Sequence, residues 1–336
     1  MGATIRTKGG YQLVNGLDHL DTLNQRTLIS PVACDGIGLH TAAAVAMTLS
    51  PADAGVGITF KRTDIARSAP IAARWDQVVD TRLCTTLGND DGNTVSTVEH
   101  LMAAFSGCGV DNVVVEVDGP ELPIMDGSSA PFVSMIESVG LVEQPAPLRI
   151  IRLHKTVTVS DGERFASLAP GDGFTLAFEI SFENPAVARQ TIMVGLVNGT
   201  FKRELASART FGFLDDVEAM QAAGLARGGS LDNAVVISGD SILNVDGLRY
   251  EDEFVRHKAL DAIGDLFLAG ARITGRFEGV CSGHDMNNRL LRAMFADAEA
   301  WSLVTVGADE AEAASQVVGE PVWTAESDQP RVAFTA

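Results

Sequence analysis

Short hydrophobic runs alternate with turn-rich segments along the first part of the chain. Asn112–Val117 is one such run, with four valines and one glutamate after its asparagine. β-Branched runs of this length favour strands over helices. One helix is predicted after Asn93, and the ordered chain is expected to begin near Gln25. The pattern therefore predicts an α+β domain over residues 25–147.

The second half of the chain repeats this order, with strands first and helices afterwards. Gln144-Pro145-Ala146-Pro147 separates the halves, because two prolines this close favour an extended connector over continuing secondary structure. The predicted elements are strands at 148–153, 155–159 and 174–180, and helices near 253–270 and 286–299. We therefore predict a second α+β domain over residues 148–305.

Both ends of the chain lack a sustained hydrophobic period. Residues 1–24 are polar and contain glycine, which predicts a flexible N-terminal extension. Residues 306–336 are acidic and rich in alanine, which predicts a C-terminal tail.

Composition narrows the function classes. Of the 336 residues, 46% are hydrophobic, enough for two cores, and the formal net charge is -19. A negative charge of this size repels a phosphate backbone, so we expect no nucleic-acid partner. No run of eighteen apolar residues and no hydrophobic secretory stretch occurs, so we expect no transmembrane segment and a cytoplasmic location. The four cysteines form no C-x-x-C pair and are expected to be reduced thiols.

One predicted helix carries a row of candidate metal ligands. His257, Asp261 and Asp265 recur every four residues, and side chains at this spacing lie one above the other on a helix. An imidazole and a carboxylate on one face could bind a single ion. A solvated ion pair on the helix surface explains the same spacing.

Two other histidines stand in settings that suit acid–base chemistry. Glu99 precedes His100, so it could be a general base beside a metal ligand, but Ser96 and Glu99 also have the spacing of a capping box. Gly107 is the expected stop of that helix. His284 follows Gly283 just before an amphipathic helix, where it could act as an acid or base or bond to nearby backbone groups.

Six segments, in this order along the chain, together resemble the bacterial zinc-dependent UDP-3-O-acyl-N-acetylglucosamine deacetylases, which catalyse the committed step of lipid A synthesis. The resemblance covers about Gln25 to Asp297. The segments are Asp35–Thr41, Ser96–Ala104, Pro123–Phe132, Ala208–Phe213, Phe254–Asp265, and Ser282–His284 with Asn287-Asn288.

The resemblance implies that His100, His257 and Asp261 bind one catalytic Zn²⁺. Two imidazoles and one carboxylate leave a fourth position for water, as in catalytic zinc sites. The same donors suit Fe²⁺. The ion would assist hydrolysis of the substrate N-acetyl group, which releases acetate.

Four further residues match catalytic groups of the family. Glu99 is implied as the general base, and His284 as the group that stabilises the oxyanion and protonates the leaving nitrogen. Asp265 would orient His284 and favour its charged form. The Thr210 hydroxyl would help to hold the oxyanion, although a threonine at this position could equally cap local backbone.

The resemblance also implies residues that bind the UDP-3-O-acyl-N-acetylglucosamine substrate. Lys258 would contact the diphosphate and Phe182 the uridine, while Arg164 stands where a lysine is familiar. The apolar residues within about 210–238, Phe211 among them, would line a passage for the acyl chain. A stripe of this kind is by default a core face.

The implied architecture has two α+β domains of similar topology with the zinc site at their interface, in a monomer. Inserts are expected within about 62–90, including Cys84, and about 210–238. The chain departs from the family pattern at Ala42, where glycine is usual, and at Phe105, where leucine is common. We expect a structural role for His40, because neither a ligand nor a base lies beside it in the sequence.

Three other functions fit part of this pattern. A zinc hydrolase of another acetylated amino sugar would need different nucleotide contacts. A peptidase would normally show H-E-x-x-H, which does not occur here. A catalytically silent nucleotide-sugar or lipid-binding module would not need the complete set of Glu99, His100, Asp261 and His284.

Overall fold

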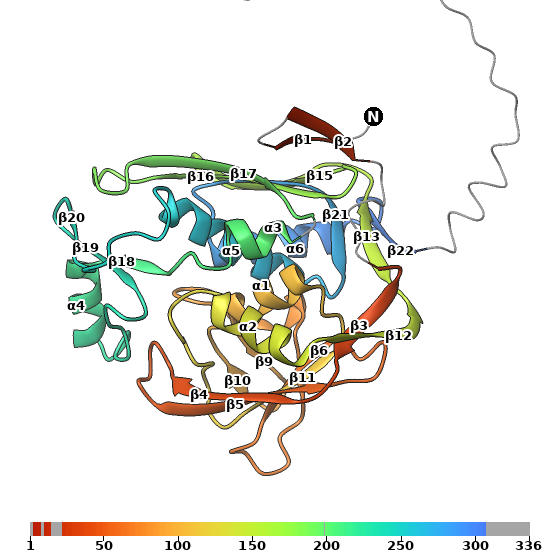
Figure 1. The fold of residues 1–336 in the computed structure, drawn as a ribbon, viewed down its shortest axis with the longest axis horizontal. Helices are drawn as coiled ribbons and strands as arrows, with labels where there is room; N and C mark the ends of the chain where they lie inside the picture. Colours follow the sequence, from red (N-terminus) through yellow and green to blue (C-terminus); the bar gives the residue numbers. More distant parts are fainter. Residues whose placement is uncertain (1–2, 8–9, 15–21, 198, 307–336) are drawn as a thin grey trace, which may run out of the picture.

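The fold is α+β, with helices enclosed between two large sheets (Figure 1). The structure, a computed structural model, describes residues 3–7, 10–14, 22–197 and 199–306. No helix in these ranges is long and apolar enough to cross a membrane.

The first half of the chain builds a five-stranded sheet in the order β4-β5-β11-β6-β7. Central strand β11 (Val113–Val117) runs antiparallel to β5 and parallel to β6. Val113, Val115 and Val117 of this strand are fully buried, because alternate side chains of a strand face the same side. The other strands of this sheet are β4 (Val32–Ile37), β5 (Ala44–Pro51), β6 (Ile58–Arg62) and β7 (Ile71–Ala72).

The second half builds a larger sheet around β21 (Arg272–Val280). This strand is parallel to β13 and β16 and antiparallel to β15, and β22 pairs with β13 at an edge. The remaining bounds are β13 (Arg149–Leu153), β14 (Val157–Asp161), β15 (Arg164–Ala169), β16 (Phe174–Ser181), β17 (Arg189–Gly195) and β22 (Trp301–Thr305).

Helices α1 and α5 pack against each other in the interior and connect the two halves (Figure 1). Gly264 permits their close approach, since a Cβ atom at this position would lie 2.0 Å from the carbonyl oxygen of Glu99. Gly109 ends α1 with a φ of +72°, a conformation that glycine adopts without strain. The helices are α1 (Glu99–Cys108), α2 (Ala130–Val139), α3 (Thr200–Glu204), α4 (Leu214–Ala222), α5 (Glu253–Phe267) and α6 (His284–Ala296).

Two small sheets lie in the predicted inserts. In the first, β9 pairs with β8 on one side and with β10 on the other, and in the second, β19 pairs with β18 and with β20. The bounds are β8 (Val78–Asp80), β9 (Thr86–Gly88), β10 (Thr94–Val95), β18 (Phe211–Phe213), β19 (Val235–Ser238) and β20 (Ser241–Ile242), with the 3₁₀ helix η1 (Trp75–Gln77) before β8.

The structure differs from the sequence pattern at three places. The predicted proline connector belongs to β12 (Leu141–Pro147), which pairs with β3 (Asn24–Leu28), and the register shifts where the prolines remove N–H donors. The predicted N-terminal extension contains an antiparallel pair, β1 (Ala3–Thr7) and β2 (Gly10–Val14). Helix α1 ends at Gly109, not at Gly107. The predicted C-terminal tail, from residue 307 onward, lies outside the described residues.

Candidate active site

Three buried side chains form a group that could hold a metal ion. His100 lies in the first turn of α1, while His257 and Asp261 lie one turn apart on α5. The Oδ1 atom of Asp261 is 3.5 Å from Nε2 of His100 and 3.3 Å from Nε2 of His257. All three ligand atoms lie within 4.8 Å of one another. The predicted ligand triad is therefore brought together from two helices that are far apart in the sequence.

The hydrogen bonds of this group leave Nε2 of His257 and Oδ1 of Asp261 available to bind a cation. The Nδ1–H group of His257 donates to the carbonyl oxygen of Ala208 at 3.1 Å, so its Nε2 carries the lone pair. Oδ1 of Asp261 is buried and accepts no hydrogen bond from any residue that the structure describes. A buried carboxylate oxygen without a partner is costly unless a cation satisfies it. The donor set fits a catalytic metal site.

The charges of the group also suit a metal ligand set. Burial lowers the pKa of His257 to about 4, which keeps this imidazole neutral at pH 7. Burial acts to raise the pKa of Asp261, but attraction to His257 and Lys258 prevails and holds it well below 3.8. Lys258 donates to the other carboxylate oxygen, Oδ2, at 2.7 Å.

Beside the triad, Glu99, Asp265 and His284 form a second group. Nδ1 of His284 lies 2.8 Å from Oδ2 of Asp265, and Nε2 lies 3.9 Å from Oε1 of Glu99. Burial acts to lower the pKa of His284, but the two carboxylates outweigh it and raise the pKa to about 9. Burial raises the pKa of Glu99. A protonated imidazole thus stands next to a carboxylate that can accept a proton.

Two residues that the sequence pattern missed complete this group. The amide of Asn287 donates to Oδ2 of Asp265 at 2.9 Å, and the Thr85 hydroxyl donates to Oδ1 at 2.6 Å. The backbone N–H of Thr85 also donates to Oε2 of Glu99 at 3.0 Å. Asn287 lies in a segment that carried the family resemblance, but Thr85 had no signal other than its place in the predicted first insert.

The capping-box interpretation of Glu99 is wrong. Helix α1 begins at Glu99 itself, with Val98 as its N-cap and no side-chain hydrogen bond to the cap. The Glu99 carboxylate instead accepts from the N–H of Thr85. The spacing from Ser96 is therefore coincidental, because the N-cap of α1 is Val98 and Ser96 lies between β10 and the helix.

The triad, together with Glu99 and His284 of the second group, lines one cavity of about 700 Å³, and Asp265 lies behind His284. Residues from both halves of the chain line it: Leu39, His40, Cys84 and Thr97 from the first, and Phe182, Thr210, Lys258 and Met220 from the second are among them. A cavity of this size accommodates a large organic ligand.

Aromatic side chains line one side of this cavity. The ring centroids of Phe182 and Phe211 are 6.0 Å apart, those of Phe182 and Phe213 are 5.7 Å apart, and Phe211 packs on Phe254 at 4.8 Å. Phe182 is 37% exposed. The predicted substrate residues Phe182, Phe211 and Lys258 thus share the cavity with the metal group.

The cavity includes His40 but not Arg164. Arg164 forms an ion pair with Asp161 beside the turn between β14 and β15 and does not line the cavity. The backbone N–H of His40 donates to Glu121, which agrees with a structural role. However, His40 lines the cavity, and both of its buried ring nitrogens lack a hydrogen-bond partner within the described part of the chain.

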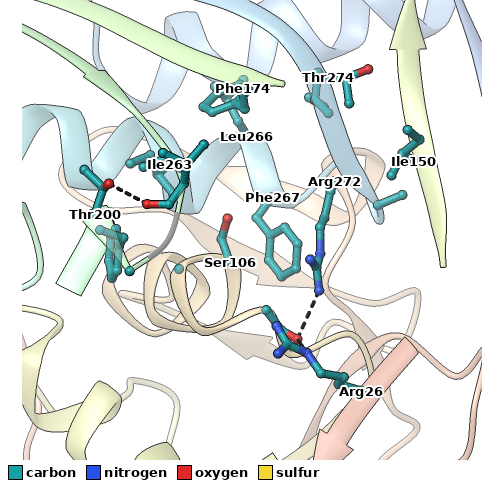
Figure 2. A pocket seen from close by; sticks show the side chains of 18 residues that line it. Arg26, Ser106, Ile150, Phe174, Thr200, Ile263, Leu266, Phe267, Arg272 and Thr274 are labelled. Carbon is teal, nitrogen blue, oxygen red and sulfur yellow. Dashed lines mark hydrogen bonds between the residues drawn. The ribbon is translucent and has the colours of Figure 1, made fainter. Parts of the chain in front are cut away.

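A smaller cavity of about 100 Å³ lies at the other end of α5 (Figure 2). Its walls are mainly apolar, and Leu266 and Phe267 contribute to them. Arg26 and Arg272 lie side by side at one end, where both donate to the carbonyl oxygen of Gly109. These arginines hold the end of α1, so we assign this cavity no chemistry.

Comparison with known proteins confirms the resemblance. The family model for UDP-3-O-acyl N-acetylglycosamine deacetylase (LpxC) matches residues 25–296. A UDP-3-O-acyl-N-acetylglucosamine deacetylase from Phenylobacterium zucineum (strain HLK1) is 53% identical over 290 residues, which cover 86% of this chain and 99% of that protein. A protein with the same name from Idiomarina loihiensis is 48% identical, over 87% of this chain and 96% of its own. One from Shewanella loihica is 47% identical, over 85% and 94%. Since these matches span most of the chain and nearly all of its relatives, the chain belongs to the UDP-3-O-acyl N-acetylglycosamine deacetylase family.

Proposed function

We propose that this chain hydrolyses the N-acetyl group of UDP-3-O-(3-hydroxyacyl)-N-acetylglucosamine and releases acetate, the committed step of lipid A biosynthesis. Family membership supports the substrate and the reaction. The observation that carries the proposal is the shared cavity, in which the buried triad lies next to the Glu99, Asp265 and His284 group.

The metal we propose is Zn²⁺, held by Nε2 of His100, Nε2 of His257 and Oδ1 of Asp261. Fe²⁺ suits the same donors. When bound, the ion supplies a Lewis acid that polarises the amide carbonyl and activates water. The unpartnered Oδ1 of Asp261 supports this assignment, as does the hydrogen bond that fixes the His257 tautomer.

Glu99 and His284 move protons in the proposed reaction. Oε1 of Glu99, the oxygen not held by the N–H of Thr85, takes the proton of the attacking water. Nε2 of His284 stabilises the oxyanion and protonates the leaving nitrogen, while Asp265 holds its Nδ1–H. We assign the Thr210 hydroxyl to the oxyanion, since this residue lines the same cavity.

The substrate contacts follow from the lining of the cavity. We assign the diphosphate to Lys258, the uridine to Phe182 and part of the acyl passage to Phe211. Lys258 has three N–H donors, so it can contact a phosphate oxygen while one donor stays on Oδ2 of Asp261. Arg164 remains a predicted substrate residue outside the cavity. The two-domain division, the cytoplasmic location and the monomeric state also remain predictions.

A Glu99→Gln variant tests the proposal. Glutamine keeps an oxygen for the N–H of Thr85 but cannot take a proton, so we expect turnover to fall about 10²- to 10⁴-fold with little change in melting temperature. Acetate release from UDP-3-O-acyl-N-acetylglucosamine, with metal content measured in parallel, is the assay. Normal activity in Glu99→Gln would overturn the role of Glu99. Equal turnover of an acetylated amino sugar that lacks UDP would overturn the proposed identity of the substrate.

A further inference from the structure

Thr85 contacts the carboxylates of both Glu99 and Asp265, although it lies in neither α1 nor α5, the helices that carry these residues. It directly precedes β9 in the predicted first insert. Its N–H donates to Oε2 of Glu99 at 3.0 Å, and its hydroxyl donates to Oδ1 of Asp265 at 2.6 Å. The residue is 2% exposed, so water does not compete for either bond.

These two bonds determine which carboxylate oxygens remain for chemistry. Oε2 of Glu99 is engaged, so Oε1 is the oxygen that faces His284. Oδ1 of Asp265 is engaged as well, so Oδ2 receives Nδ1–H of His284 and the amide of Asn287. Thr85 is itself fixed, because its carbonyl oxygen accepts the N–H of Val98 immediately before α1.

We propose that Thr85 is a positioning residue that keeps the general base Glu99 and the His284–Asp265 pair in a fixed orientation relative to each other. The inference rests on the roles proposed above for Glu99, Asp265 and His284. Its hydroxyl acts through Asp265, and its backbone N–H acts on Glu99. Removal of the hydroxyl leaves Oδ1 of Asp265 buried without a donor, so the carboxylate rotates and His284 loses its orientation.

The first test compares side chains of equal shape. Thr85→Val replaces the hydroxyl with a methyl group of similar size, and we expect kcat to fall about 10- to 100-fold with KM within about twofold. Thr85→Ser restores the hydroxyl and should keep kcat within about threefold. Thr86→Val is the matched control, because the neighbouring Thr86 hydroxyl bonds to Ser96 and touches neither carboxylate. Activity is expressed per metal-loaded site, so that misfolded protein does not count as lost catalysis.

The second test is a double-mutant cycle with Asp265→Ala. If Thr85 acts through Asp265, Thr85→Val should cost less than about twofold in kcat once Asp265 is absent. Equal losses in both backgrounds would overturn the inference, and so would unchanged kcat in Thr85→Val alone. Should Thr85→Val fail to fold, Thr85→Ala and Thr85→Ser form a second pair that differs only in the hydroxyl.

Glu99→Gln and His284→Ala separate this inference from the proposed function. If both variants lose turnover while Thr85→Val keeps it, only the positioning role is wrong. If both retain turnover, the proposed proton-transfer roles are wrong, and the inference about Thr85 is wrong with them.

Discussion

Three acidic side chains in or next to one cavity differ in character because their immediate neighbours differ. Asp261 lies against His257 and Lys258, which hold its pKa low and prepare it to be a metal ligand. Glu99 is buried with a raised pKa and a single backbone donor, which suits a group that gains and loses a proton. Asp265 accepts three hydrogen bonds and orients its neighbour. Environment, not residue type, separates the three proposed roles.

The raised pKa of His284 predicts a pH-dependent contribution to stability in the metal-free protein. The folded-state pKa of about 9 exceeds the ordinary 6.5, so the contribution is complete below pH 6.5 and is lost as pH rises through 9. The measurement is urea unfolding of chelated wild type and His284→Gln at pH 6, 8 and 9.5. The difference in free energy of unfolding should shrink with rising pH.

Site residues that lie within the family motifs could be predicted from the sequence. Residues that reach the site only through contacts made in the folded structure could not. His100, His257 and Asp261 meet as expected, because the family motifs contain them. Thr85 lies 180 positions from Asp265, and its hydroxyl has no local pattern that reports the bond. The same limit explains why the sequence left the capping box open as an alternative for Glu99, whose partner Thr85 comes from a different loop.

At the scale of elements, the site depends on how closely α1 and α5 approach each other. His100 is on one helix, and its two co-ligands are on the other. The run of β-branched residues made strand β11 predictable, whereas β12 was mistaken for a connector because its prolines concealed an edge strand. The contact between α1 and α5 could not be predicted from the sequence. A glycine within a helix, such as Gly264, indicates that another group packs closely there, but it does not identify that group.

A Gly264→Ala substitution should push these two helices apart. Its Cβ atom would lie 2.0 Å from the Glu99 carbonyl oxygen and 3.1 Å from the backbone nitrogen of Ala103, neither of which can move like a flexible side chain. We expect a loss of about 3 kcal/mol or more in unfolding free energy, with weaker metal binding.

Denaturant unfolding and metal titration are the measurements for this prediction. Gly119→Ala is the control, because a Cβ there meets only Val45 at 3.5 Å, an ordinary contact. Wild-type metal affinity in Gly264→Ala would contradict the proposed dependence on helix spacing.

At the scale of the whole molecule, residues from both halves of the chain line the cavity. Backbone bonds from the second predicted insert add to this, since the N–H groups of Arg227 and Gly228 donate to His40 and Leu39 of the first half. The metal group lies in the same region, with ligands from both halves. Rigidity between the halves should therefore depend on the ion.

Removal of the metal should lower the stability of the entire chain. With free Zn²⁺ at 100 times its Kd, binding adds about 2.7 kcal/mol to the free energy of unfolding. Calorimetry before and after complete chelation should show a lower melting temperature, restored by added Zn²⁺. His257→Ala should lose this response, while a variant at the exposed His154 should keep it. An unchanged transition after verified metal removal would contradict the coupling.

The distribution of the three ligands also bears on how the protein could be divided. A break after Pro147 would leave His100 on one fragment and both α5 ligands on the other. Neither fragment would hold a complete site, so metal affinity would itself report their reassembly. We therefore expect deacetylase activity from two separately made fragments only when a metal ion joins them.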